Sequence, residues 1–239
     1  MSSKKGRSAI RNGEPLAPDT THWREESEAW KAAYLAESER FRRLKAMPRK
    51  LRLLGVEDLP RNSRILDLCC GSGEAMLALA NMGFTNLTGL DIEIPRELAA
   101  DPRFVTHVGD ARATHLPDSS FDCILNIHAM HHLETADNIE LFLDECHRLL
   151  KPGGRLGIVD FPNSLQIRLA FWFFRQNIGL WTPYLRMFGR IIQEEWRFLR
   201  DYLPQWDRIR NRLYNGKFRI RSRKKSLFYL FLVLEKPSV

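Results

Sequence analysis

Segments that read as strands alternate with segments that read as helices between residues 64 and 159, and this alternation constrains the fold most. Short apolar runs bounded by turn residues predict strands, and longer stretches with apolar residues three or four apart predict helices. Strands separated by helices pair in parallel, because the chain must cross the sheet between neighbours. The predicted strands are residues 64–69, 86–90, 104–108, 121–127 and 155–159, and the predicted helices are 73–82, 96–100 and 136–150.

The chain on either side of this core completes the predicted architecture. Residues 1–18 are polar and predict a flexible tail, and residues 19–239 predict a single domain that begins with helices over 19–55, one of them at 48–54. A long aromatic helical region at about 164–213 predicts an inserted cap. Strands at 217–221 and 227–234, joined by "SRKKS", predict an antiparallel hairpin. We therefore expect an α/β, Rossmann-like fold with a seven-stranded, mostly parallel sheet, an antiparallel C-terminal hairpin and helices on both faces.

The charge of the chain favours anionic partners without choosing among them. The formal net charge is +8, and residues 208–225 carry nine basic side chains and no acid. Nucleic acid, a membrane surface and an acidic metabolite all fit this excess, and an ordinary solvated surface explains it equally well. No run of 18 apolar residues and no apolar signal core occur, so we expect a cytoplasmic protein. The four cysteines form no spaced CxxC pair, which argues against a structural zinc site or a disulfide framework.

The stretch "ILDLCCGSGEAMLALA", residues 65–80, places an acid and two glycines where the first strand turns into a helix. Glycines there let the backbone turn tightly and let a ligand approach closely. A dinucleotide site would need a third glycine, and Met76 holds that position. Asp67 would also repel a phosphate. The turn therefore favours a ligand that carries an ammonium group.

Acids end three successive predicted strands. Asp67 ends the first and Asp91 the second, where a carboxylate can accept both hydroxyls of a ribose. Asp110 ends the third and could accept from the exocyclic amine of a purine. An ammonium group, a ribose and an adenine occur together in S-adenosylmethionine, whose sulfonium cation also suits acidic surroundings.

Four stretches resemble the successive motifs of class I S-adenosylmethionine-dependent methyltransferases, in their order along the chain. They are "LDLCCGSG", "LTGLDI", "GDARATHLPDSSFDCILNIHAMHHL" and "LLKPGGRLGIVDF", and the resemblance covers about residues 63–161. It implies that the first motif surrounds the methionine part, the second holds the ribose, the third holds the adenine, and the end of the fourth strand lines the methionine and faces the substrate. The cofactor-binding residues that it implies are Asp67, Cys70, Gly71, Gly73, Asp91, Ile92, Asp110, Ala111 and Asn126.

Three histidines in "NIHAMHHL" are the candidate catalytic residues. A base is needed only where the acceptor must lose a proton, and His128, His131 and His132 titrate in the right range. They could equally shape the pocket without proton transfer. We expect no metal site, because the side chains of adjacent residues such as His131 and His132 should point apart and no third ligand is evident.

The cap region bears on the methyl acceptor. Aromatic and arginine side chains alternate there, as in a lid around a lipophilic molecule that rests on an anionic bilayer, or in a helical cap with its own core. The segment "LRMFGRIIQEEWRFLRDYLP" resembles the matching region of menaquinone and ubiquinone C-methyltransferases. We expect a small, hydrophobic acceptor that is quinone-, lipid- or polyketide-like, with an anionic membrane surface as a further partner. The alternatives are an RNA methyltransferase, for which no RNA-binding motif is evident, and a protein of this fold that binds the cofactor without methylating.

Overall fold

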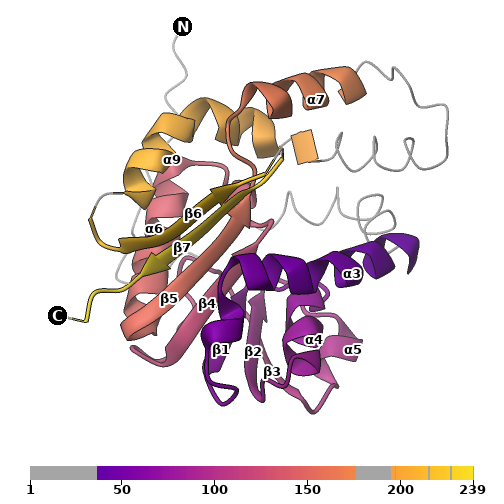
Figure 1. Ribbon diagram of the computed structural model, residues 1–239, viewed down its shortest axis with the longest axis vertical. Coiled ribbons are helices and arrows are strands. Elements are labelled where there is room, and N and C mark those ends of the chain that lie inside the picture. The colour runs from indigo at the N-terminus through magenta and orange to yellow at the C-terminus, as the bar shows by residue number, and fades with distance from the viewer. Residues whose placement is uncertain (1–36, 176–194, 197, 215, 227, 239) are drawn as a thin grey trace, which may run out of the picture.

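The computed structural model describes residues 37–175, 195–196, 198–214, 216–226 and 228–238 (Figure 1). The predicted tail and about half of the predicted helical region at 19–55 lie outside this part, as does the middle of the predicted cap. The strands are β1 Arg64–Leu68, β2 Asn86–Asp91, β3 Phe104–Val108, β4 Phe121–Ile127, β5 Leu150–Asp160, β6 Arg219–Lys225 and β7 Leu230–Glu235. The helices are α3 Glu37–Leu53, η1 Val56–Asp58, α4 Glu74–Asn81, α5 Arg96–Ala99, η2 Met130–Leu133, α6 Ala136–Leu149, α7 Leu165–Arg175, η3 Leu203–Gln205 and α9 Trp206–Leu213.

The seven strands form one sheet in the order β3-β2-β1-β4-β5-β7-β6. The first five are parallel, and β7 runs antiparallel to β5 and to β6. This confirms the predicted fold class. The strand order reverses between β1 and β4, and ligands of open α/β sheets bind beyond the carboxyl ends of the strands at such a point.

Helices cover both faces of the sheet because the strands bury side chains on both (Figure 1). On β1, Ile65 packs into a cluster with α3, α4 and α5, while its neighbour Leu66 packs into a second cluster with α6, α7 and α9. Successive side chains of a strand point to opposite faces, so a strand covered on both sides reads as a continuous apolar run. The interiors of β4, β5 and β7 likewise consist of consecutive buried residues.

One helix boundary was predicted wrongly. We expected a separate helix at 48–54 that begins at Pro48, whereas α3 runs through this proline without interruption. An interior proline costs a helix about 3 kcal/mol. Met47, Leu51 and Leu54 are all buried in the core, and each such side chain contributes about 1.5–3 kcal/mol. Burial therefore outweighs the cost of the proline.

The C-terminal hairpin is present, but its strands are displaced from the prediction. The residues of "SRKKS" that were expected to form the link lie mostly within β6, and the turn is closed by the Ser226 N–H donating to the Tyr229 oxygen at 2.8 Å. β6 is an edge strand whose side chains are almost all exposed. Basic residues suit such an edge because they discourage pairing with another chain. β5 begins earlier than the predicted strand at 155–159 and includes "KPGG", where the Gly153 N–H donates to the Lys236 oxygen. Among the described helices, none is both long and apolar enough to cross a bilayer.

Candidate active site

The turn after β1 is bound to the end of β2. The Cys69 N–H donates to the Leu90 oxygen at 2.8 Å, and the Gly71 N–H donates to Asp91 Oδ2 at 2.7 Å. Gly71 has a φ of +50°, in the left-handed region that glycine adopts readily. This contact fixes the carboxylate of Asp91 beside the turn, at the point where the strand order reverses.

Asp67 lies in a buried cluster of acids. Its side chain shares the carboxyl end of β1 with the neighbouring carboxylates of Glu74 and Asp91, and the residue is only 3% exposed. Burial, with smaller contributions from these two acids, raises the pKa of Asp67 to about 8. Glu74 is compensated by Arg43, whose Nη2 lies 2.7 Å from Glu74 Oε1. A cation beside Asp67 would stabilise its charged form, so the cluster fits a positively charged ligand.

Asn126 adds an uncompensated acceptor to the same place. It is fully buried at the end of β4, and its Nδ2 donates to the Leu68 oxygen at 3.0 Å. Its Oδ1 has no hydrogen-bond partner among the described residues. A buried acceptor without a partner is costly, and an ammonium group would satisfy it.

Asp91 and Asp110 have different surroundings. Burial raises the pKa of Asp91, while N–H donors such as that of Gly71 oppose the rise. Ile92, which follows it, is 38% exposed and offers an apolar surface next to the carboxylate. At Asp110 burial would also raise the pKa, but hydrogen bonds from Arg112 hold it below its ordinary value. The sequence did not indicate this pairing of Asp110.

Three of the predicted cofactor residues have side chains or Cβ positions that face the core. Cys70 and Ala111 are buried in the two core clusters. A Cβ at Gly73 would lie 2.5 Å from the Leu98 side chain of α5. These residues can therefore offer a ligand only their backbone, and the need for glycine at 73 comes from packing against α5 and from a φ of +78°.

His131 lies between two carboxylates. Its Nδ1 is 2.8 Å from Asp160 Oδ1, and its Nε2 is 2.7 Å from Glu195 Oε2. Burial alone would lower the pKa of His131, but the two carboxylates raise it to about 10. In this arrangement the imidazole is held as a cation at neutral pH.

His132 lies beside the same group, which contradicts one expectation from the sequence. The rings of His131 and His132 have centroids 4.3 Å apart, and His132 Nε2 is 3.6 Å from Glu195 Oε2. Our reasoning that these side chains point apart and lack a third neighbour was wrong, because both rings lie beside Glu195, which the fold brings in from more than 60 residues along the chain. Burial and the charge of His131 lower the pKa of His132 to about 4.

His128 forms a separate pair with a lysine. Lys50 Nζ of α3 is 2.7 Å from His128 Nε2, and the His128 ring packs against Tyr229 with centroids 4.5 Å apart. Burial and the nearby Lys50 hold the pKa of His128 well below its ordinary value. Burial and Arg43 lower the pKa of Lys50 to about 8.

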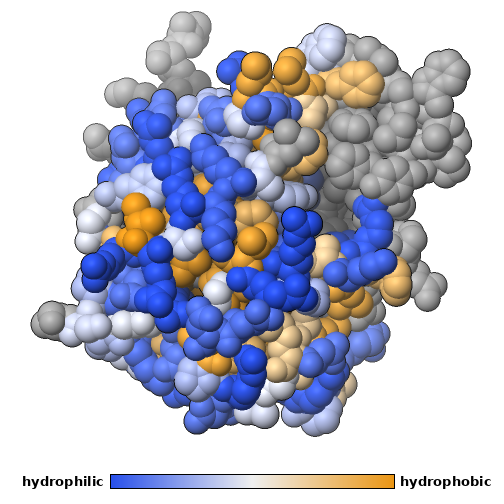
Figure 2. Space-filling model, in the orientation of Figure 1, coloured by the Kyte–Doolittle hydropathy of each residue, from blue (hydrophilic) through white to orange (hydrophobic). Residues whose placement is uncertain are grey.

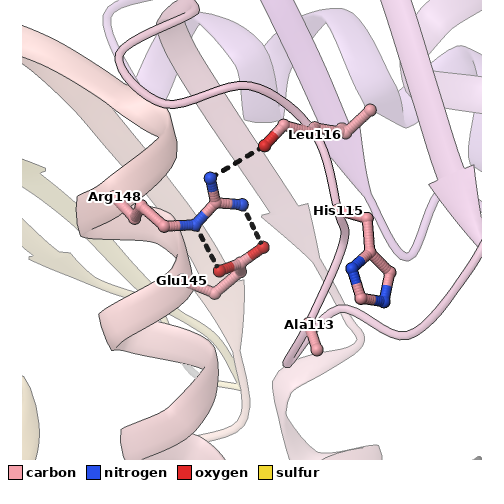
Figure 3. Close-up of a pocket in the computed structure, with 5 residues that line it drawn as sticks. All are labelled: Ala113, His115, Leu116, Glu145 and Arg148. Atoms are coloured by element: carbon pink, nitrogen blue, oxygen red, sulfur yellow. Dashed lines mark hydrogen bonds and ion pairs between the residues drawn. The ribbon is translucent and has the colours of Figure 1, made fainter. Parts of the chain in front are cut away.

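The loop after Asp110 is fixed to α6. A hollow of about 300 Å³ lies there, lined by Ala113, His115, Leu116, Glu145 and Arg148. Figure 3 shows Arg148 bonded both to Glu145 and to the Leu116 oxygen. Glu145 also accepts from the N–H and hydroxyl of Thr114. We read this network as structural, because its polar groups are directed at one another and it holds the loop that carries Asp110.

Sequence reasoning missed the partners of nearly every candidate. Lys50, Asp160 and Glu195 contact predicted site residues directly. Glu74 lies near Asp67 and is bonded to Arg43. Asp160 could have been found, because it ends a parallel strand as Asp67 and Asp91 do. The others lie on helices, where no local pattern distinguishes a buried charged residue from a solvated one.

Comparison with known proteins gives a consistent result. Residues 66–158 match the model of a family described as a methyltransferase domain. A 2-methyl-6-phytyl-1,4-hydroquinone methyltransferase of Synechocystis sp. is 32% identical over 139 residues, which cover 54% of this chain and 43% of that protein. A 27-O-demethylrifamycin SV methyltransferase of Amycolatopsis mediterranei is 31% identical over 119 residues, covering 46% and 43%. The chain thus spans a little under half the length of these relatives.

Solved structures share the fold. The Burkholderia thailandensis 1,6-didemethyltoxoflavin-N1-methyltransferase, solved with 1,6-didemethyltoxoflavin and S-adenosylhomocysteine, superposes with a TM-score of 0.56 over 96% of this chain and 98% of that one. The two are 18% identical. The likeness concerns the arrangement of the whole domain rather than particular side chains.

Proposed function

We infer that this chain transfers a methyl group to a small lipophilic acceptor. Residues 66–158 form a methyltransferase domain of the class I S-adenosylmethionine-dependent type. The observation that carries the inference is the group of buried carboxylates at the point where the strand order reverses. Asp91 is fixed by the glycine turn, and among the described residues no cation close to Asp67 keeps its pKa low. Such a group suits an adenosyl ligand with positive charge.

The residues of the site divide the cofactor among them. Asp67 and Asn126 Oδ1 accept from the ammonium group, and Asp91 accepts from the ribose hydroxyls. Ile92 packs against the adenine, and Asp110 lies at its edge. Hydrogen bonds to charged groups contribute about 1.5–3 kcal/mol each. Several together are sufficient for micromolar binding.

Catalysis requires alignment and, for a hydroxyl acceptor, removal of a proton. Bound S-adenosylmethionine supplies the electrophilic methyl group. Orientation of reacting groups by the site can contribute about 7–11 kcal/mol. We assign proton acceptance to the Lys50–His128 pair, because a Lys50 pKa of about 8 lets the pair lose its own proton near neutral pH and take one from the acceptor.

The surroundings of the histidines support a lipophilic acceptor. Phe161 follows β5 and has ring centroids 5.9 Å from His128 and 5.2 Å from His131. Phe171 and Tyr229 pack against Phe161 in turn. An apolar wall next to the proposed base excludes water and favours aromatic or isoprenoid groups. The Synechocystis and Amycolatopsis relatives, named for a phytyl hydroquinone and a rifamycin, agree with acceptors of this kind.

A lipophilic acceptor would be reached at a membrane surface, and two features support such contact. Leu165, Leu169 and Trp172 of α7 are more than half exposed, and apolar side chains are visible over α7 at the upper edge of Figure 2. The edge strand β6 presents exposed basic residues. Apolar side chains with neighbouring basic charge bind anionic lipid surfaces.

The test is a transfer assay with radiolabelled S-adenosylmethionine against lipid, aqueous and RNA fractions of source cells. We expect label in the lipid fraction, in a small molecule, and none above background with Asp91→Ala. Label in RNA would replace the proposed acceptor. If the protein binds S-adenosylhomocysteine but labels no fraction, the assignment of methyl transfer is overturned.

A further inference from the structure

Two adjacent histidines and a distant glutamate converge at the carboxyl ends of β4 and β5. His131 and His132 belong to η2, and Glu195 comes from a part of the chain more than 60 residues away. One donor atom from each of the three lies within 4.8 Å of the other two. The proposed methyl-transfer mechanism uses none of these contacts.

The distances suit a shared metal ion. Zinc binds imidazole nitrogen at about 2.0–2.1 Å and carboxylate oxygen at about 2.0–2.2 Å, so two ligands of one ion lie about 3 Å apart. Glu195 Oε2 is 2.7 Å from His131 Nε2 and 3.6 Å from His132 Nε2. The donor atoms of the three residues all lie within 4.8 Å of one another, so rotations of the side chains would bring them to one ion.

Asp160 has the position of a residue that orients a metal-binding histidine. Its Oδ1 lies 2.8 Å from the ring nitrogen Nδ1 of His131, and its Oδ2 accepts from the backbone N–H of His131 at 3.0 Å. Histidine ligands usually donate their second ring nitrogen to such a carboxylate, which directs the other nitrogen at the ion. Asp160 is 1% exposed and also accepts from the Phe161 N–H at 2.6 Å. His131 Nε2 is thereby directed at Glu195.

A proton shared within the cluster is the simpler explanation, but it accounts for fewer of the contacts. A proton on His131 Nε2 bridges that nitrogen to Glu195 alone. A second proton, on His132 Nε2, would point at the same carboxylate oxygen, but the separation of 3.6 Å is too long for a hydrogen bond. A cation that binds two imidazoles and a carboxylate accounts for all three positions together, and this ligand set suits zinc and neighbouring divalent transition metals.

We propose that His131, His132 and Glu195 bind a divalent transition-metal ion of the zinc type, with Asp160 holding His131 in position. The ion takes the place of the proton between His131 Nε2 and Glu195, and that proton is released to solvent. Catalytic zinc sites have three protein ligands and one open position, and these three are the protein ligands found in the part of the chain that the structure describes. Resting on the proposed function, we assign the open position to an oxygen of the methyl acceptor. The ion would lower the pKa of that oxygen beside the Phe161 ring.

Metal binding can be measured without methyl transfer. The full chain, freed of metal by a chelator, is titrated with Co²⁺ and followed by visible absorption, and with Zn²⁺ by calorimetry. We expect one equivalent to bind with micromolar or tighter affinity. Glu195→Gln and His132→Ala should each weaken binding at least tenfold, while His107→Ala, at an exposed histidine of β3, should leave it unchanged. Equal affinity in wild type and Glu195→Gln would overturn the site.

A second measurement on the wild type guards against variants that fail to fold. In a spectrum of the histidine ring signals, substoichiometric Co²⁺ should shift or broaden those of His131 and His132 and spare that of His107. Broadening at other histidines only would refute the proposal.

Failure of the metal site is distinguishable from failure of the proposed function. A protein that binds one Co²⁺ at these histidines without transferring methyl groups retains the site and loses the function. A protein that transfers methyl groups with no metal bound retains the function and lacks the metal site.

Discussion

Buried carboxylates carry most of the functional information at the scale of single residues. Aspartate is rarely buried without a charged or hydrogen-bonding partner, yet Asp67 lies at the end of β1 near two other acids. The sequence predicted the acid and its place, because strand ends can be recognised from local patterns. It could not predict how deeply Asp67 is buried, since this depends on α3 and α4 packing over it.

Asp67 should release a proton when the cofactor binds. Its pKa of about 8 means that the free protein holds this carboxyl mostly protonated at pH 7. The ligand's ammonium group favours the carboxylate, so binding should expel close to one proton, and affinity should rise as pH increases from 6 to 8. Calorimetric titration with S-adenosylhomocysteine in buffers of different ionisation enthalpy measures the number released. In Asp67→Asn the release should disappear, and an undiminished release in that variant would rule out this assignment.

At the scale of elements, periodicity predicted the strands better than it predicted their surroundings. The spans of β3 and β4 match the prediction residue for residue, because each apolar run is bounded by turn residues. α3 was divided wrongly at Pro48, since a local rule does not include the burial of the helix face. The contact of Glu195 with η2 was invisible for the same reason. Tertiary packing decided both.

Gly73, at the start of α4, should be intolerant of a side chain. A left-handed conformation costs a residue with a Cβ about 1–2 kcal/mol, and the new Cβ would press on buried Leu98, adding at least about 1 kcal/mol. Gly73→Ala should therefore lose about 2–3 kcal/mol of unfolding free energy in urea. Gly216→Ala is the matched control, because φ there is +91° with open space around it. This variant should lose only the about 1–2 kcal/mol that the left-handed backbone costs. Equal losses in the two variants would show that Leu98 yields without cost.

At the scale of the molecule, one end of the sheet differs from the other in charge. The edge strand β6 presents exposed arginines and lysines, and these lie among the hydrophilic side chains in Figure 2. The basic run at residues 208–225 gave the sign of this surface, and the fold places part of that run on the edge strand β6. Whether it faces lipid depends on how it lies relative to α7, which only the folded arrangement decides.

Charge reversal on β6 should weaken binding to anionic vesicles. A basic residue near such a surface contributes about 1 kcal/mol, so Lys224→Glu should lower the partition onto phosphatidylserine vesicles at least fivefold. Arg96→Glu on α5, next to the opposite edge strand β3, is the matched control and should have little effect. Cosedimentation at low and high salt measures both. If the two variants behave alike, β6 is not the contacting surface.

The most direct test of the account is the structure of the full chain crystallised with S-adenosylhomocysteine. We predict that the ribose hydroxyls lie within hydrogen-bonding distance of the Asp91 carboxylate and that the ammonium group contacts Asp67 and Asn126 Oδ1. A nucleoside bound elsewhere on the molecule, or bound at the turn with Asp91 directed into solvent, would contradict the central claim.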